Sequence, residues 1–143
     1  MKINFVRESL EFSRRGVLTG IISLELGPDK YFPEKQWNDN IVLILESWKN
    51  ELDVMKINSN YKGRFVFFDG PFYFTLSKAS NLYRVDFFEN RKSTSSCFVD
   101  INVFFKEVLC IGNELLLLAK ERQWESIELD KLRPIFLRHR GDI

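Results

Sequence analysis

The chain has 143 residues and a mass of 17.0 kDa, which is the size of one domain, so we expect residues 1–143 to form a single domain. Apolar residues make up 45% and charged residues 29%, a composition that can bury a core and that excludes a disordered chain. With 21 Lys and Arg against 20 Asp and Glu, the net charge is +1, which lacks the basic excess typical of nucleic-acid-binding proteins.

Two strands are predicted near the N-terminus, over residues 3–12 and 22–26. In the second, Ile22, Leu24 and Leu26 alternate with polar residues, which is the pattern of a half-buried strand. Residues 14–16 contain Arg, Arg and Gly and predict a hairpin turn between the strands. The Gly-Pro-Asp sequence at residues 27–29 ends the second strand in another turn.

A helix is predicted over residues 34–52. Pro33 suits its first turn, where the missing N–H of proline costs nothing. Five apolar residues recur every three or four positions and so share one helical face: Trp37, Ile41, Leu45, Trp48 and Leu52. We expect Trp37 and Trp48 to be buried against a sheet, because large aromatic side chains dominate core energetics.

Four more strands are predicted in the middle of the chain, over residues 64–68, 72–77, 83–87 and 97–101. Asp69 and Gly70 form a tight-turn signal between the first two, and residues 89–96 read as a polar turn. Along residues 72–77, two sets of side chains alternate: Phe72, Phe74 and Leu76 against Tyr73, Thr75 and Ser77. Because alternate side chains of a strand point to opposite faces, we expect the first set to face the helices.

The last third of the chain predicts a second helix, capped by Asp100 or Asn102 and running to about residue 123. Gly112 inside it permits another element to approach closely, and residues 130–143 form a short terminal element with a basic end. The whole order of elements predicts an α+β protein: a twisted antiparallel sheet of about five to six strands with two main helices packed on one face.

The cysteine count and the absence of long apolar segments predict a cytoplasmic protein. Cys97 and Cys110, without a secretory leader, are typical of free, buried thiols in a reducing compartment. The N-terminal residues lack the apolar segment of a signal peptide. The longest apolar runs, residues 41–45 and 115–119, are far shorter than the ~18 residues that cross a membrane. We therefore expect no membrane partner.

No set of residues in the sequence points to catalysis. The single histidine, His139, lies between two arginines near the C-terminus, where the cations disfavour its protonated form. Two cysteines and one histidine, with no close pair, make a poor zinc set, and no glycine-rich phosphate loop occurs. Asp39 and Glu46 lie two turns apart on the solvent side of the predicted helix. We therefore expect no enzyme, catalytic residue, cofactor or metal.

A longer pattern combines three short motifs: Tyr31-Phe32-Pro33 followed by Trp37 and Asp39, then Leu45 with Trp48, then Phe68-Asp69-Gly70-Pro71-Phe72 before a strand. This order, over roughly residues 17–120, resembles small bacterial proteins encoded beside polymorphic or contact-dependent toxins and taken to be their immunity proteins. The resemblance implies scaffold roles, in which Phe32 and Trp37 pin the helix and Asp69-Gly70 turns a hairpin. Toxin-contacting residues vary with the target in such proteins, so none is transferred to this chain. Many immunity proteins are acidic, whereas this chain is neutral.

We therefore expect a non-enzymatic binding protein that resembles an immunity protein and neutralises a cognate toxin by occlusion. Its partner is expected to be a protein and not a nucleic acid, bound on the sheet face away from the helices or the edge beside it. Five residues are expected on that surface, where Tyr and Arg are typical of interface hot spots: Tyr73, Thr75, Ser77, Arg84 and Asp86. The alternatives are a small structural or oligomerising domain, an RNA-binding module that uses Phe-rich strands, and a weak enzyme with carboxylate chemistry.

Overall fold

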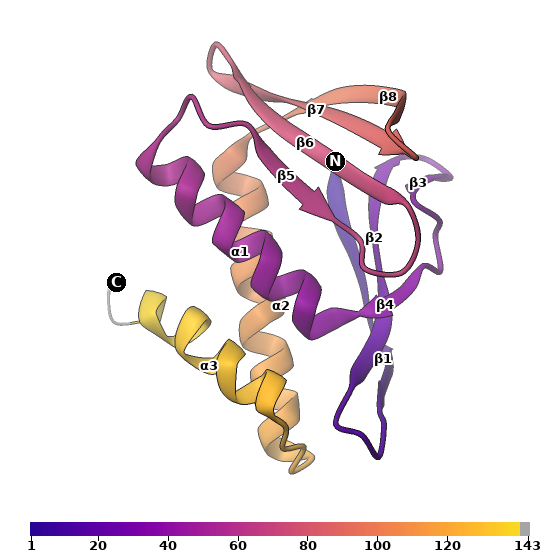
Figure 1. The fold of residues 1–143 in the computed structure, drawn as a ribbon, viewed down its shortest axis with the longest axis vertical. Helices are drawn as coiled ribbons and strands as arrows, with labels where there is room; N and C mark the ends of the chain where they lie inside the picture. Colours follow the sequence, from indigo (N-terminus) through magenta and orange to yellow (C-terminus); the bar gives the residue numbers. More distant parts are fainter. Residues whose placement is uncertain (141–143) are drawn as a thin grey trace.

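The computed structural model describes residues 1–140, with side chains through residue 136. This part of the chain has an α+β fold of eight strands and three helices, which confirms the predicted class (Figure 1). The strands form two four-stranded antiparallel sheets, called sheet A and sheet B below, so the prediction of a single sheet of five to six strands is wrong. A third helix joins the two that were predicted.

Sheet A contains the N-terminal half of the strands. Strands β1 (Lys2–Phe12) and β2 (Leu18–Gly27) pair antiparallel, as predicted, and the turn between them includes Gly16 at a φ of +80°. Two short strands, β3 (Lys30–Phe32) and β4 (Asn38–Asn40), also pair with β2. Three-residue strands carry no detectable alternation, which is why the sequence pattern missed both.

In sheet B, each strand pairs with the next one along the chain: β5 (Gly63–Val66), β6 (Phe72–Ala79), β7 (Leu82–Glu89) and β8 (Lys92–Val99). The prediction of a polar turn over residues 89–96 is wrong. The chain turns within two residues, Asn90 and Arg91, and residues 92–96 begin the edge strand β8. An edge strand that is exposed along most of its length needs no apolar alternation, so its polar sequence resembles a loop.

Helix α1 (Ile41–Ile57) begins seven residues later than predicted, because residues 38–40 pair with β2 instead of joining the helix. Asn40 is the N-cap, and its side-chain oxygen accepts a hydrogen bond from Leu43 N at 3.0 Å. Trp37 therefore precedes the helix and does not share its apolar face. The ring of Trp37 is partly buried, whereas Trp48 is fully buried, so the expectation for Trp48 is confirmed and that for Trp37 holds only in part.

Asp39 is buried, with 3% of its surface exposed, which corrects its expected place on a solvated helical face. Its carboxylate accepts hydrogen bonds from Trp37 Nε1 at 2.9 Å, from Asn40 N at 2.7 Å and from Asp69 N at 3.1 Å. Three donors satisfy a charge that would otherwise be costly to bury. The interaction ties the segment before α1 to the loop between β5 and β6.

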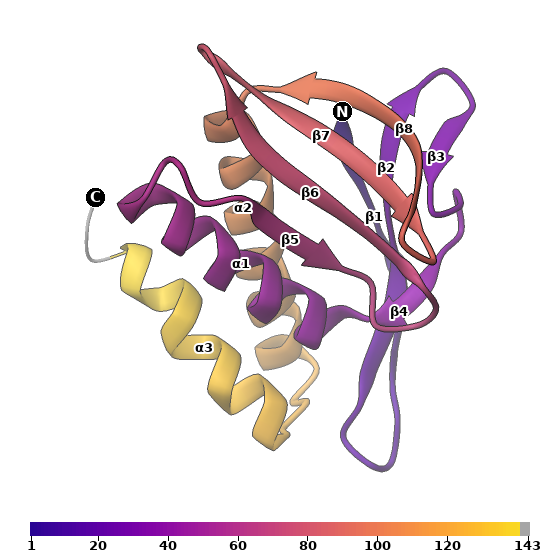
Figure 2. The ribbon, with the colours of Figure 1, turned by 45° about the horizontal axis from the view of Figure 1, so that its top comes forward.

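Helices α2 (Ile101–Glu121) and α3 (Ile127–Arg140) complete the fold. Of the two predicted caps, Asp100 is the one that caps α2, with its carboxylate accepting from Asn102 N at 2.9 Å. In Figures 1 and 2, α1 and α2 lie beneath sheet B and beside sheet A, and α3 packs on these two helices away from both sheets. Gly112 permits this packing, because a Cβ at that position would overlap the ring of Phe136 on α3.

The core is centred on Trp48. Its ring lies 5.3 to 6.3 Å, between centroids, from the rings of Phe65, Phe67, Phe74 and Phe104, mostly in edge-to-face geometry. Its indole N–H donates to the backbone oxygen of Val66 at 3.0 Å. Sheet B and the two long helices therefore share one aromatic cluster.

Trp48→Ala is expected to lower the free energy of unfolding by about 3–5 kcal/mol, because it leaves a large cavity and an unpaired carbonyl beneath sheet B. Trp37→Ala is expected to cost less, since its ring is only partly buried. Urea titration followed by circular dichroism measures both. A loss below about 1 kcal/mol for Trp48→Ala would contradict its central place in the core.

Gly112→Ala is expected to destabilise the protein by about 1–3 kcal/mol through overpacking against Phe136, although Ala is the better helix former. The same substitution made in a Phe136→Ala background removes the overlap and is expected to be neutral or stabilising. Denaturant unfolding of the wild type, the two single variants and the double variant gives the coupling energy between residues 112 and 136. Equal costs in both backgrounds would show that α3 does not pack closely on Gly112.

Candidate functional site

The outer face of sheet B, defined as the side turned away from α1 and α2, brings together all five residues expected at a partner surface. Thr75 pairs with Asp86, and Ser77 pairs with Arg84, across β6 and β7. Tyr73 lies two residues before Thr75 on the same side of β6. The inner face carries Phe74 and Leu76, which are fully buried, so the predicted division of β6 into two faces agrees with the structure.

Arg84 and Asp86 form an ion pair on this face, with Arg84 Nε 3.0 Å from Asp86 Oδ1. The Arg84 side chain is 53% exposed, whereas that of Asp86 is 17% exposed. An exposed pair of this kind contributes little to stability. It does hold one guanidinium in a defined position on the surface.

Tyr73 is the centre of a short row of stacked side chains across the outer face. The guanidinium carbon of Arg64 lies 4.2 Å from the centroid of the Tyr73 ring. The ring of Phe88 lies 4.8 Å away, nearly parallel at 7°. Because β5 and β7 flank β6 on opposite sides, these neighbours cover the Tyr73 ring from both sides. Tyr73 is therefore a rigid, half-buried anchor.

Thr75 lies on the expected face but is only 7% exposed, so it offers little surface for a direct contact with a partner. Its cross-strand neighbours are the longer side chains of Arg64 and Asp86, which stand on either side of it. The Thr75 hydroxyl is buried and has no hydrogen-bond partner among the described residues. A short side chain between long neighbours is covered by them even when its strand face is open to solvent.

Three further residues of this face were not recognised in the sequence: Arg64, Phe88 and Phe98. Phe98 on β8 pairs with Arg84 and is 57% exposed. Their membership depends on the register between strands, which places Arg64 beside Thr75 and Phe88 beside Tyr73. Alternation along each strand assigns a side chain to one of two faces, but it does not say which strands are neighbours.

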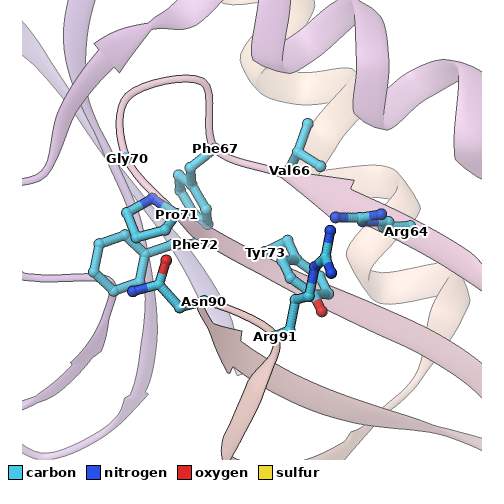
Figure 3. Close-up of a pocket in the computed structure, with 9 residues that line it drawn as sticks. All are labelled: Arg64, Val66, Phe67, Gly70, Pro71, Phe72, Tyr73, Asn90 and Arg91. Atoms are coloured by element: carbon cyan, nitrogen blue, oxygen red, sulfur yellow. The ribbon is translucent and has the colours of Figure 1, made fainter.

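A pocket of about 300 Å³ opens at the end of this face, between the β5–β6 loop and the β7–β8 turn (Figure 3). Its lining joins two arginines to an aromatic and apolar wall: Arg64, Val66, Phe67, Gly70, Pro71, Phe72, Tyr73, Asn90 and Arg91. Asn90 N donates to Pro71 O at 3.1 Å, which holds the two loops together. The pocket is thus a continuation of the row formed by Arg64 and Tyr73.

The two cysteines are free, and they lie on different elements. Cys110 on α2 is exposed, so the expectation that both thiols are buried is wrong for this residue. Cys97 on β8 is partly buried, and burial is the main cause that raises the pKa of its thiol, with a smaller contribution from Asp86.

The structure also bears on metal binding and on membrane insertion. Among the described residues, no group of three or more His, Cys, Asp or Glu side chains is arranged to hold a metal ion. No helix in the same part of the chain has the length and apolar character needed to cross a bilayer. The side chain of His139 lies outside the described residues. Comparison of the chain with protein-family models, curated proteins and solved structures finds no match.

Thr75→Val is expected to raise the free energy of unfolding by about 1 kcal/mol, because it removes a buried hydroxyl without a partner and keeps the shape of the side chain. Thr94→Val is the control, since the Thr94 hydroxyl is on the exposed part of β8 and donates to Phe87 O at 3.3 Å. Its effect should stay within about 0.5 kcal/mol. A loss of stability in Thr75→Val would mean that the hydroxyl has a partner in solution.

Proposed function

We propose that this protein is a non-enzymatic binding protein that docks a protein partner on the outer face of sheet B and acts by occlusion. The observation that carries the proposal is the rigid anchor formed by Tyr73 between Arg64 and Phe88. Tyr and Arg are enriched at interface hot spots, and anchors that are ordered before binding lose little entropy on association. The paired Arg84 and Asp86 supply a polar border to this anchor.

The same geometry favours a protein over an RNA. RNA-binding sheets stack exposed bases on aromatic rings with an open face. The Tyr73 ring has Arg64 on one side and Phe88 on the other, which leaves no face open for a base. The net charge of +1 also provides little long-range attraction for a polyanion.

Charge on the outer face indicates what the partner presents. Arg64, Arg84 and Arg91 lie on or beside this surface, and within the described part of the chain only Arg84 is paired with a carboxylate, that of Asp86. The exposed ring of Phe98 adds an apolar contact on the same side. A complementary partner surface carries acidic side chains around an apolar centre.

The role we propose is that of an immunity-like protein in the cytoplasm. The motif order around Trp37, Trp48 and Asp69-Gly70 resembles that of toxin-neutralising proteins, and the two cysteines are free, as is usual in a reducing compartment. Neutralisation by occlusion requires a stable scaffold and one complementary surface, and no catalytic group. The experiment below tests the surface independently of the biological role.

A photo-crosslinking amino acid placed at Phe98 is expected to capture the partner in cells of the native organism, whereas the same group at Leu117 on α2 is not. These two positions are matched in exposure, at 57% and 52%. The captured protein is then purified, and its affinity for the wild-type chain is measured by calorimetry. Tyr73→Ala combined with Arg84→Ala is expected to weaken binding by at least about 2 kcal/mol, roughly thirtyfold in Kd.

Unfolding curves of the double variant keep this test interpretable, because both side chains lie on the surface side of sheet B and the fold should remain intact. A well-folded double variant that binds with unchanged affinity would contradict the proposal. Capture of a second copy of this chain would instead support an oligomerising domain. Saturable binding of a single-stranded RNA of mixed sequence, lost in Tyr73→Ala, would support the RNA-binding alternative.

A further inference from the structure

The pocket at the end of sheet B is lined by two arginines, Arg64 and Arg91. Figure 3 shows the guanidinium ends of Arg64 and Arg91 extending toward each other beside the Tyr73 ring. Among the described residues, neither arginine forms an ion pair with a carboxylate. Two like charges directed into one pocket repel each other, and an anion placed between them would remove that repulsion.

The backbone at Arg91 supports a role for this side chain beyond solubility. Asn90 and Arg91 are the two central residues of the β7–β8 turn, with φ values of +51° and +68°. Such a turn prefers Asn followed by Gly, because both central residues have positive φ. Arg at the second position is strained, and strained residues are concentrated at binding sites.

The pocket is also ordered before any ligand arrives. The hydrogen bond from Asn90 N to Pro71 O joins the turn that carries Arg91 to the β5–β6 loop. That loop is in turn fixed to the core, because Asp69 N donates to the buried carboxylate of Asp39 at 3.1 Å. The Tyr73 ring holds Arg64 in place by a cation–π contact.

We propose that this pocket binds a carboxylate of the partner protein, from an Asp or Glu side chain that follows or precedes an apolar residue. This inference rests on the proposed function and names the chemistry of its central contact. The planar fork of a guanidinium matches a carboxylate through two parallel hydrogen bonds, and Arg64 and Arg91 together offer two such forks. The volume of about 300 Å³ exceeds a carboxylate alone, so the apolar wall of Pro71 and Phe72 accommodates the rest of the acidic side chain and its neighbour.

The test needs no partner, so its outcome is separate from that of the proposed function. The protein labelled with ¹⁵N is titrated with a blocked glutamate, N-acetylglutamic acid N-methylamide, at constant ionic strength, and the arginine Nε–H signals are followed by NMR. The signals of Arg64 and Arg91 are expected to shift and saturate together. The signal of Arg84 is the internal control, because its Nε already donates to Asp86.

Two control ligands define the chemistry. The blocked glutamine of the same shape is expected to cause no saturable shift, because it lacks the charge. Inorganic phosphate is expected to bind no more tightly than the blocked glutamate. Tighter binding of phosphate, or equal shifts at every exposed arginine, would overturn the assignment of a carboxylate site.

Arg91→Gly separates a binding role from a structural one. Glycine adopts a positive φ without steric strain, so the variant is expected to gain about 2 °C in Tm. Its affinity for the blocked glutamate is expected to fall about tenfold, because one guanidinium is lost. Arg64→Gln is expected to lose affinity to the same degree, and Arg7→Gln on β1, outside sheet B, is expected to keep it. Unchanged affinity in both Arg91→Gly and Arg64→Gln would overturn the proposal, whether or not the outer face binds a protein.

Discussion

The burial of Trp48 is the constraint on which the rest of the structure depends. Its indole N–H must have a partner once it leaves water, and the partner is the carbonyl of Val66 on β5. This bond and the surrounding rings of Phe65, Phe74 and Phe104 hold sheet B against α1 and α2. Because strand side chains alternate, committing Phe74 to the helices commits Tyr73 to the opposite surface. The face proposed to bind a partner is thus a consequence of how the core is packed.

Core residues also fix the loop that lines the pocket at the end of that face. Trp37 packs against Phe72 and lies beneath Gly70, where a Cβ would come within 3.0 Å of its ring. The buried carboxylate of Asp39 binds both Trp37 and the backbone of Asp69. The β5–β6 loop is therefore held from below by aromatic packing and from its side by a charge-assisted hydrogen bond. A loop fixed in this way presents Pro71 and its neighbours in one arrangement, which is what a selective surface requires.

The outer face of sheet B carries several arginines, although the net charge of the whole chain is close to zero. The chain has almost equal numbers of acidic and basic residues, yet sheet B brings Arg64, Arg84 and Arg91 to one surface, and only Arg84 has a carboxylate partner among the residues that the structure describes. Net charge governs long-range attraction, whereas the placement of unpaired charges governs the contact itself. This difference makes the proposed site for acidic groups compatible with a neutral protein. It also explains why overall composition says little about the chemistry of the site.

The sequence by itself determined the α+β class, the strands β1, β2, β6 and β7, the helix α2 with a cap at Asp100 or Asn102, and the two faces of β6, since each follows from local periodicity or a local hydrogen bond. It did not determine where α1 begins, because Asn38, Asp39 and Asn40 gain more from pairing with β2 and from the buried contacts of Asp39 than from joining the helix. Local patterns in the sequence also do not show that the strands form two sheets, that Thr75 is buried, or that Arg64 and Arg91 line one pocket. Those features depend on which distant segments become neighbours, and only the packing of the whole chain decides that.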